Sequence, residues 1–174
     1  MTAGYLPRNR FTKDRIVPTE YDKTFRKTLL EGYVHDQGAA MAGGVAGHAG
    51  LFASANDLAI YAQLLLNRGE YGGERYFKTE TVDTFTSNQS PNSRRGLGFD
   101  RKDPDPASRY PGTFVSDATF GHTGYTGTAI WMDPKERLIY IFLSNRVHPE
   151  VSDQLSNLAI RRRILDSIYM AIQK

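Results

Sequence analysis

Apolar residues return every three or four positions between residues 55 and 68, which predicts an amphipathic helix. The repeating positions are Leu58, Tyr61, Ala62 and Leu65. Ser54 and Asp57 form a capping box just ahead of this repeat, so the helix should begin there. Gly69 follows Arg68 as a left-handed stop, which places the end of the helix at about residue 68.

Two later segments also show helical spacing. Val82 and Phe85, which follow Thr79, predict a helix of about two turns that ends before Pro91. The last part of the chain predicts a longer helix that begins near Ser152 or Asp153. Its apolar stripe consists of Leu155, Leu158, Leu165, Ile168, Tyr169 and Ile172. A stripe of this kind is suited to packing against one face of a sheet.

Between these helices the pattern changes to that of strands. Residues 128–132 and 138–143 are apolar runs on either side of a turn at 133–136, where Pro134 suits the second position of a type I turn. The two runs predict a β-hairpin. The second run is apolar on both faces, so we expect helices to cover both sides of the sheet. Residues 96–100 predict a short strand, and the three prolines within 102–112 predict a surface loop.

Residues 1–50 show little periodicity and many breakers, which predicts mostly irregular structure with a short strand or helix around Tyr33 to Ala42. So long an irregular stretch normally packs against something else, which indicates part of a larger domain. We predict an α+β fold for residues 1–174 as a single domain, with an antiparallel sheet flanked by helices. Missing elements would leave apolar surface exposed, which favours a homo-oligomer.

Composition narrows the function classes. The chain has 174 residues, of which 40% are hydrophobic and 24% charged, enough for one hydrophobic core. Its net charge is +3 and no basic stripe with interleaved aromatic residues is present, so we expect no nucleic-acid partner. The absence of cysteine excludes disulfides and thiol chemistry. No signal-like segment starts the chain, so a periplasmic or secreted location is expected only if a longer parent carries a signal upstream.

The stretch from Phe120 to Gly127 concentrates the candidate chemistry, because it places a histidine and two threonines among three glycines. Gly124 would let a ligand backbone approach a strand edge, and Thr123 could donate its hydroxyl to a substrate carboxylate or carbonyl. A glycine-rich turn that leads into a hairpin would explain the glycines without any ligand. The pattern alone leaves both interpretations open.

A metal site is the competing chemical hypothesis. The four histidines, His35, His48, His122 and His148, could in principle converge with Asp36. Their spacing matches no zinc signature, and we therefore expect neither a metal nor another cofactor. No pair of carboxylates suited to glycoside hydrolysis stands out either.

Three stretches resemble the serine β-lactamase and penicillin-binding-protein superfamily, in its class C-like or esterase-like branch. They are residues 43–59, residues 121–124 (Gly-His-Thr-Gly) and residues 143–146 (Leu-Ser-Asn-Arg). The segments 18–22 and 34–36 are similar to a subgroup that in some bacteria is fused to a β-N-acetylglucosaminidase-type glycoside hydrolase. The resemblance covers almost the whole chain, but only the C-terminal half of the family's domain.

The resemblance implies a β-lactamase/transpeptidase-like fold and acyl-enzyme hydrolysis of an amide or ester. It assigns two catalytic residues: His122 takes the place of the lysine in the family's third motif, and the backbone amide of Tyr125 contributes to the oxyanion hole. The substrate-binding residues that it implies are Thr123, Gly124, Asn145 and Arg146. A β-lactam or a cell-wall peptide is the kind of substrate expected.

Two of the family's motifs do not occur in these 174 residues. Neither Ser-x-x-Lys, which supplies the nucleophile, nor Tyr-x-Asn or Tyr-x-Ser is present. In the family both motifs lie upstream of the matched part, so we expect the isolated chain to be inactive and its partner to be the missing N-terminal half of the domain. The alternative is a non-catalytic accessory or binding module of a larger cell-wall or glycan-processing protein.

Overall fold

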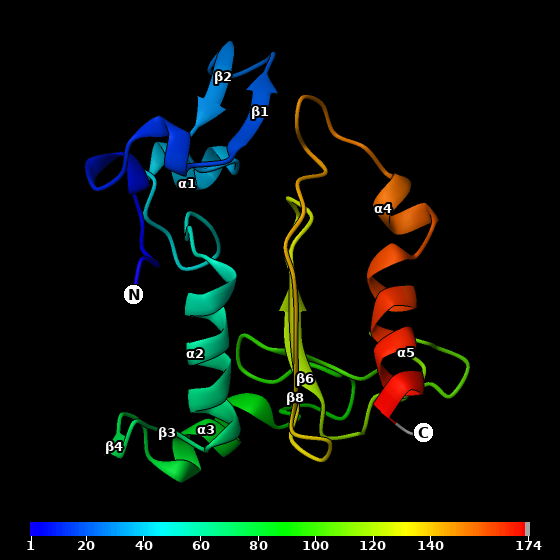
Figure 1. Ribbon diagram of the computed structural model, residues 1–174. Coiled ribbons are helices and arrows are strands. Elements are labelled where there is room, and N and C mark those ends of the chain that lie inside the picture. Colours follow the sequence, from blue (N-terminus) through cyan, green and yellow to red (C-terminus); the bar gives the residue numbers. More distant parts are fainter. Residues whose placement is uncertain (173–174) are drawn as a thin grey trace.

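The computed structural model describes residues 1–172 and shows an α+β fold (Figure 1). At its centre is a four-stranded antiparallel sheet in the order β5-β6-β7-β8. Its strands are β5 (Asp100–Arg101), β6 (Phe120–Thr123), β7 (Ala129–Asp133) and β8 (Leu138–Phe142). The helix α2 (Ala55–Leu66) covers one face, and α5 (Ile160–Ile172) covers the other.

The remaining elements are short. They are the 3-10 turns η1 (Pro7–Asn9) and η2 (Lys13–Arg15), the hairpins β1 (Pro18–Asp22) with β2 (Thr28–Glu31) and β3 (Glu70–Tyr71) with β4 (Glu74–Arg75), and the helices α1 (Gln37–Met41), α3 (Thr79–Thr86) and α4 (Gln154–Asn157). The hairpin of β1 and β2 lies with α1 at one end of the central sheet (Figure 1).

Side chains alternate along the strands between two hydrophobic cores. Met132 and Phe120 pack with Ala62 and Leu65 of α2 on one face. On the other face, Trp131, Ala129 and Tyr140 pack with Leu165 and Tyr169 of α5. Each fully buried large apolar side chain contributes roughly 1.5–3 kcal/mol. The expectation that helices cover both faces of the hairpin is confirmed.

The helix predicted after Ser54 is present with its expected cap. The Ser54 hydroxyl accepts a hydrogen bond from the Asp57 amide (3.2 Å), and α2 continues to Leu66. Arg68 (φ 54°) and Gly69 (φ 96°) then adopt left-handed conformations and end it. The two-turn helix predicted after residue 78 is α3.

Three expectations are corrected. The C-terminal helix is broken into α4 and α5, because Ala159 takes a left-handed conformation (φ 49°) that an α-helix cannot contain. Leu158, expected on the buried stripe, lies next to this break and is 55% exposed, and Ile172, also expected on the stripe, is 52% exposed at the end of α5. The strand expected at 96–100 shrinks to two residues, because the Gly96 amide bonds the Phe99 carbonyl in a turn.

The third correction concerns the first 50 residues, which contain an unpredicted antiparallel hairpin. Its turn is closed by Asp22, whose carboxylate accepts hydrogen bonds from the amides of Thr24, Phe25 and Arg26 and from the Arg26 side chain. The Arg26 bond, with those from the backbone, holds the pKa of Asp22 well below its ordinary value. The short strand or helix expected around Tyr33 to Ala42 is α1.

The start of the chain is anchored on α2 by Asp57, whose carboxylate accepts hydrogen bonds from the Thr2 hydroxyl, the Thr2 amide (3.0 Å) and the Ser54 hydroxyl (3.0 Å). These bonds, the Thr2 hydroxyl first, lower the pKa of Asp57 from 3.8 to about 2. A carboxylate whose pKa is lowered by folding stabilises the fold at any pH above its ordinary pKa. This stabilisation is lost as the pH falls through the lowered pKa. Its contribution should therefore disappear between about pH 4 and pH 2.

We expect the stability gap between the wild-type chain and Asp57→Asn to be constant above pH 5 and to shrink as the pH falls toward 2. Urea unfolding followed by circular dichroism at each pH measures it. A matched Asp14→Asn variant at an exposed position should show no such gap. A gap for Asp57→Asn that widened in acid would contradict this assignment.

Among the described residues, no helix has both the length and the apolar character needed to cross a membrane.

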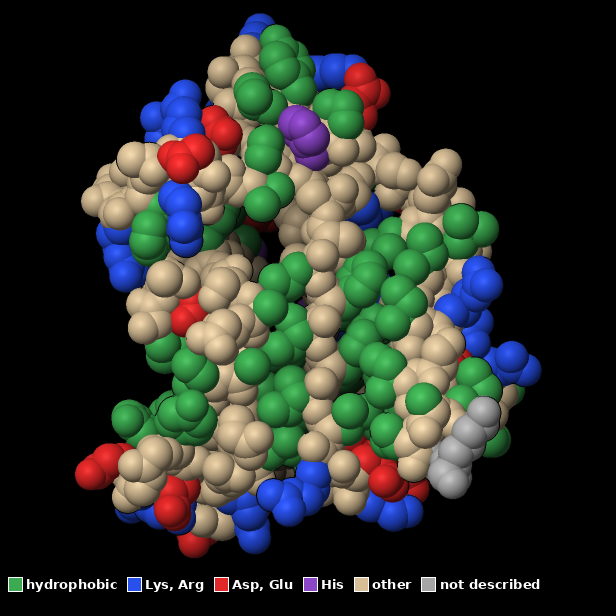
Figure 2. Space-filling model, viewed as in Figure 1, with side chains coloured by type: hydrophobic (Ala, Val, Ile, Leu, Met, Phe, Trp, Pro, Cys, Tyr) green, Lys and Arg blue, Asp and Glu red, His purple; other side chains and the backbone are tan. Residues whose placement is uncertain are grey.

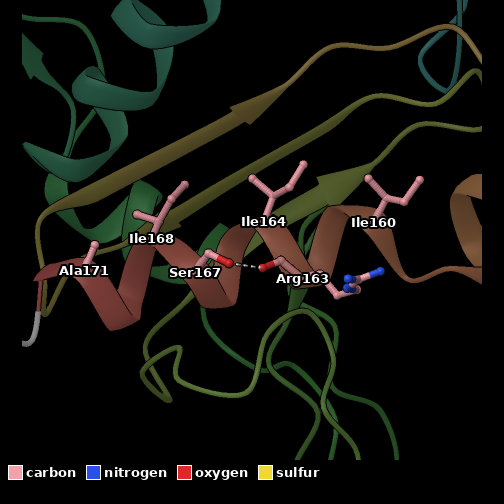
Figure 3. A pocket seen from close by; sticks show the side chains of 6 residues that line it. All are labelled: Ile160, Arg163, Ile164, Ser167, Ile168 and Ala171. Atoms are coloured by element: carbon pink, nitrogen blue, oxygen red, sulfur yellow. Dashed lines mark hydrogen bonds between the residues drawn. The ribbon is translucent and has the colours of Figure 1, made fainter.

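One edge of the central sheet is bare. Within residues 1–172, β8 has a strand partner only on the β7 side. Figure 2 shows hydrophobic side chains on both sides of the column of backbone where Figure 1 places β8. On the α5 side, these hydrophobic side chains lead into a groove of about 460 Å³ (Figure 3). It is lined by Ile160, Arg163, Ile164, Ser167, Ile168 and Ala171.

We expect the 174-residue chain to self-associate through this bare edge, since an uncharged strand edge with apolar flanks favours pairing. Size-exclusion chromatography with light scattering tests it. Ile164→Lys, in the groove, should shift the mass toward the monomer, whereas Met170→Lys, which is similarly exposed on the same helix but outside the groove, should not. A clean monomer for the wild-type chain at high concentration would refute the expectation.

Candidate functional site

The Gly-His-Thr-Gly segment lies where the sheet opens. Strand β5 pairs with β6 only as far as Gly121, so no strand of the described residues covers that edge of β6 beyond it. On the other edge, the Gly124 amide donates to the Thr128 carbonyl (2.8 Å). Because backbone groups alternate along a strand, the backbone of Thr123 faces the open edge. An extended ligand could pair there as an extra strand.

His122 projects from the α2 face of β6 and is held by two hydrogen bonds. Its Nδ1 lies 2.7 Å from the Thr123 carbonyl oxygen, and its Nε2 lies 3.0 Å from an Arg95 guanidinium nitrogen. The carbonyl can only accept and the guanidinium can only donate. Both contacts are therefore satisfied by a neutral ring that carries its hydrogen on Nδ1.

Thr123 points to the opposite face of β6 from His122, toward α5. It lines a cavity of about 420 Å³ between the sheet, the loop around Tyr110 and the junction of α4 and α5. The lining is aromatic, hydroxylic and cationic: Ser108, Arg109, Tyr110, Pro111, Thr123, Trp131, Tyr140, Leu155, Ser156, Ala159, Arg161, Arg162 and Leu165.

Arg161 is the notable cation of this cavity. Its guanidinium donates to the Thr128 carbonyl (2.9 Å), and no carboxylate in the described part of the chain lies within ion-pair distance of it. Burial lowers the pKa of Arg161 from its ordinary value. A partly buried arginine without an acidic partner favours the binding of an anion, and a carboxylate can take two of its N–H groups at once.

The wall of the cavity is fixed by buried Asp100. It accepts two hydrogen bonds from Arg94 (2.7 and 3.1 Å) and one from the Tyr110 hydroxyl (2.8 Å). Burial opposes its charge, but these bonds outweigh burial and the pKa of Asp100 is lowered. Burial and the bond to Asp100 raise the pKa of Tyr110 to about 12. Tyr110 therefore remains a neutral hydrogen-bond donor.

The predicted Gly124 and Tyr125 form the turn between β6 and β7, in which the Gly127 amide donates to the Gly124 carbonyl (3.1 Å). A Cβ on Gly124 would meet the Thr128 hydroxyl at 2.2 Å, and Gly127 has a φ of 114°. The geometry of the turn thus explains why glycine occupies both positions, whether or not a ligand binds. Its open side exposes Tyr125.

Asn145 and Arg146 lie in the loop after β8 and already have several protein partners. The Asn145 amide donates to the carbonyls of Pro18 (2.5 Å) and Thr19 (3.2 Å), which ties the N-terminal hairpin to the sheet. Arg146 donates to the Tyr125 carbonyl (2.6 Å) and contacts Asp153 (3.0 Å). Their substrate contacts remain predictions, and each residue also holds the fold together.

The structure adds residues that the sequence pattern did not single out. Arg95 lies next to His122, and Arg161 lines the same cavity as Thr123, although both arginines are distant from the motif in the chain. The run of three arginines at residues 161–163 is the only signal in the sequence near Arg161, and it does not point to a cavity. The histidines do not gather: His35 pairs with Glu20 (3.2 Å) and His48 with Asp36 (3.1 Å), and residues 1–172 contain no cluster that could hold a metal.

Comparison with known proteins decides the family. The β-lactamase family model matches residues 3–163. The chain belongs to the β-lactamase family. This is the family of serine hydrolases that the segment Gly121–Gly124 resembles, and the α+β architecture is consistent with it.

Two relatives show how much of the length of a related protein this chain covers. The chain is 34% identical over 95% of its length to a protein of Escherichia coli K12 named "Putative D-alanyl-D-alanine carboxypeptidase", and 36% identical to its counterpart in Escherichia coli O157:H7. It spans 40% of the length of each. A solved β-lactamase of Mycobacterium bovis is 26% identical over 63% of this chain and 42% of its own, with a TM-score of 0.48.

Proposed function

We propose that this chain supplies the substrate-binding edge and one oxyanion-hole donor of a β-lactamase-family serine hydrolase whose substrate is an amide or ester with a nearby carboxylate. The observation that carries the proposal is the open edge of β6, which lies between the Arg161 cavity and the Tyr125 turn. A substrate laid along this edge would reach an anion site on one side and a free backbone amide on the other.

The Tyr125 amide is suited to the oxyanion. Within the described residues no acceptor takes its hydrogen, and the turn places it just beyond the strand edge. In acyl transfer such a donor binds the negative oxygen of the tetrahedral intermediate, and losing one costs about 3 kcal/mol of transition-state stabilisation. The second donor would be the amide of the nucleophilic serine, which is outside these 174 residues.

The cavity beside Thr123 is suited to a carboxylate. The Thr123 hydroxyl can donate one hydrogen bond, and the guanidinium of Arg161 supplies charge without competition from an internal acid. The two relatives carry the name "Putative D-alanyl-D-alanine carboxypeptidase", and a peptide that ends in D-alanyl-D-alanine has a free carboxylate. We therefore favour a cell-wall peptide over a simple neutral ester.

His122 would act through hydrogen bonds. As a neutral ring it can orient the base network of the intact site, and Arg95 keeps a positive charge 3.0 Å from its Nε2. The nucleophile and its base would come from the missing N-terminal half, so the 174-residue chain alone should hydrolyse nothing by this route.

The decisive test uses the intact protein, which contains this chain and the N-terminal half of the domain. The reading frame upstream of residue 1 should encode Ser-x-x-Lys followed by Tyr-x-Asn or Tyr-x-Ser, and the intact protein should release D-alanine from a peptide ending in D-alanyl-D-alanine. An upstream half with neither motif, or an intact protein inert toward both peptides and esters, would refute the proposal.

Arg161→Ala tests the anion site within the intact enzyme. We expect KM for the D-alanyl-D-alanine peptide to rise about 10- to 100-fold, because a charge-assisted hydrogen bond is lost, with little change for a neutral ester. Arg163→Ala is the matched control, since it removes an equal charge from the groove on the other side of α5. Equal effects of the two variants would contradict the role of Arg161.

The alternative is a binding module without chemistry, and the same cavity favours it, because anion binding needs no nucleophile. If the upstream half proves degraded, the isolated chain should still bind N-acetyl-D-alanyl-D-alanine in an NMR titration, with shifts at Thr123 and Arg161. Fusion to a glycoside hydrolase also stays a prediction, which the extended reading frame decides.

A further inference from the structure

Tyr125 is unusual for a residue at a hairpin tip because its ring is held from two directions. The residue is 60% exposed, yet the His35 ring lies 5.1 Å from it, tilted by 36°, and the Arg146 guanidinium lies over its ring at 4.3 Å. Exposed turn residues usually move freely. These two contacts restrict the side chain, and with it the peptide unit that carries the amide.

The two side chains that contact the Tyr125 ring, His35 and Arg146, are held in place by further contacts. Arg146 donates to the Tyr125 carbonyl, and its other end donates to the Ser152 carbonyl (3.1 Å) and to Asp153 (3.0 Å). On the opposite side, the His35 Nε2 lies 3.2 Å from a Glu20 carboxylate oxygen. The backbone carbonyl of His35 accepts a hydrogen bond from Arg26 (2.8 Å).

The N-terminal hairpin thereby reaches the turn. Glu20 belongs to β1, and Arg26, which bonds the His35 carbonyl, also lies 3.8 Å from Glu20 and is bound to Asp22. His35 and Glu20 are only 21% and 16% exposed at their side chains, so their contact is shielded from solvent. A rigid support of this kind, built from a distant part of the sequence, is what a precisely oriented donor requires.

We infer that His35 is a positioning residue: with Glu20 behind it, it clamps Tyr125 against Arg146 and so fixes the turn amide that the proposed function assigns to the oxyanion hole. The catalytic meaning of the clamp rests on that proposed function. The clamp itself is a property of these 174 residues. It gives the N-terminal hairpin a role in the site, beyond completing the fold.

The clamp is tested first on the 174-residue chain, without any activity. In His35→Ala, hydrogen exchange of the two hydrogen-bonded amides of the turn, those of Gly124 and Gly127, should become at least about 5-fold faster when measured by NMR. His35→Phe keeps a ring against Tyr125 and should restore most of the protection. His48→Ala is the matched control, because His48 makes a similar pair with a carboxylate, Asp36, away from this turn. Unchanged protection in His35→Ala, or equal loss in His48→Ala, would overturn the clamp.

The second arm uses the intact enzyme. His35→Ala should lower kcat about 10-fold with KM nearly unchanged, since a misplaced donor weakens the transition state more than substrate binding, and His35→Phe should recover much of it. Full kcat in His35→Ala would overturn the positioning role. An intact wild-type protein without any hydrolysis would instead refute the proposed function, and the exchange measurement would still decide the clamp.

Discussion

Replacing Gly121 with alanine should lower the free energy of unfolding by about 3 kcal/mol. A Cβ at this position would lie 2.1 Å from the Ile130 carbonyl oxygen and 2.8 Å from the Trp131 Cα. Both are backbone atoms of β7, the strand paired with β6, so they cannot move aside without breaking the ladder. Urea unfolding followed by Trp131 fluorescence measures the loss.

Gly124→Ala is the comparison, because its Cβ would meet only the Thr128 hydroxyl, at 2.2 Å, which can rotate away. We expect a loss of about 1 kcal/mol, most of it recovered in the double variant with Thr128→Ala. If Gly121→Ala were no more harmful than Gly124→Ala, the crowding between β6 and β7 would be overstated.

Asp133→Ala should be equally damaging, with a loss of about 3 to 4 kcal/mol. This buried carboxylate accepts hydrogen bonds from the Ser116 amide (2.9 Å), the Ser116 hydroxyl (2.6 Å) and the Tyr169 hydroxyl (2.5 Å). Burial opposes the charge, but these bonds outweigh it and lower the pKa of Asp133. Removing the carboxylate would leave the buried Tyr169 hydroxyl and the partly buried amide and hydroxyl of Ser116 without this acceptor.

Two further variants serve as comparisons in the same unfolding measurement. Tyr169→Phe removes a single hydroxyl from the same cluster and should cost about 1 kcal/mol. Asp117→Ala removes an almost fully exposed carboxylate, paired only with Lys102, and should leave the free energy of unfolding nearly unchanged. An Asp133→Ala variant as mild as Asp117→Ala would show that the cluster adds little to stability.

The elements that could be predicted from sequence are those with local signals. The α2 helix starts at a cap formed by neighbours, Ser54 and Asp57, and stops at Gly69, so three positions define it. The β7–β8 hairpin has two apolar runs and a proline in its turn. The position of Gly121–Gly124 at an open strand edge also agrees with the motif.

The parts that could not be predicted depend on contacts between distant segments. Nothing local marks Ala159 as left-handed, so the break before α5 was not foreseen. The N-terminal hairpin is closed by Asp22 and docked by Asn145 from the other end of the chain. Arg161 lies in a run of three arginines far from the motif in the chain, and only the fold brings it to the cavity that Thr123 lines.

The order of the central sheet has a consequence for how the molecule forms. Strands β6, β7 and β8 are neighbours in space in the same order as in the chain and are joined by short turns, so their pairing needs only short loop closures. Topologies of low contact order fold quickly. These three strands can therefore pair before the N-terminal hairpin docks. Proteolytic nicking between that hairpin and α2 would then leave these three strands paired.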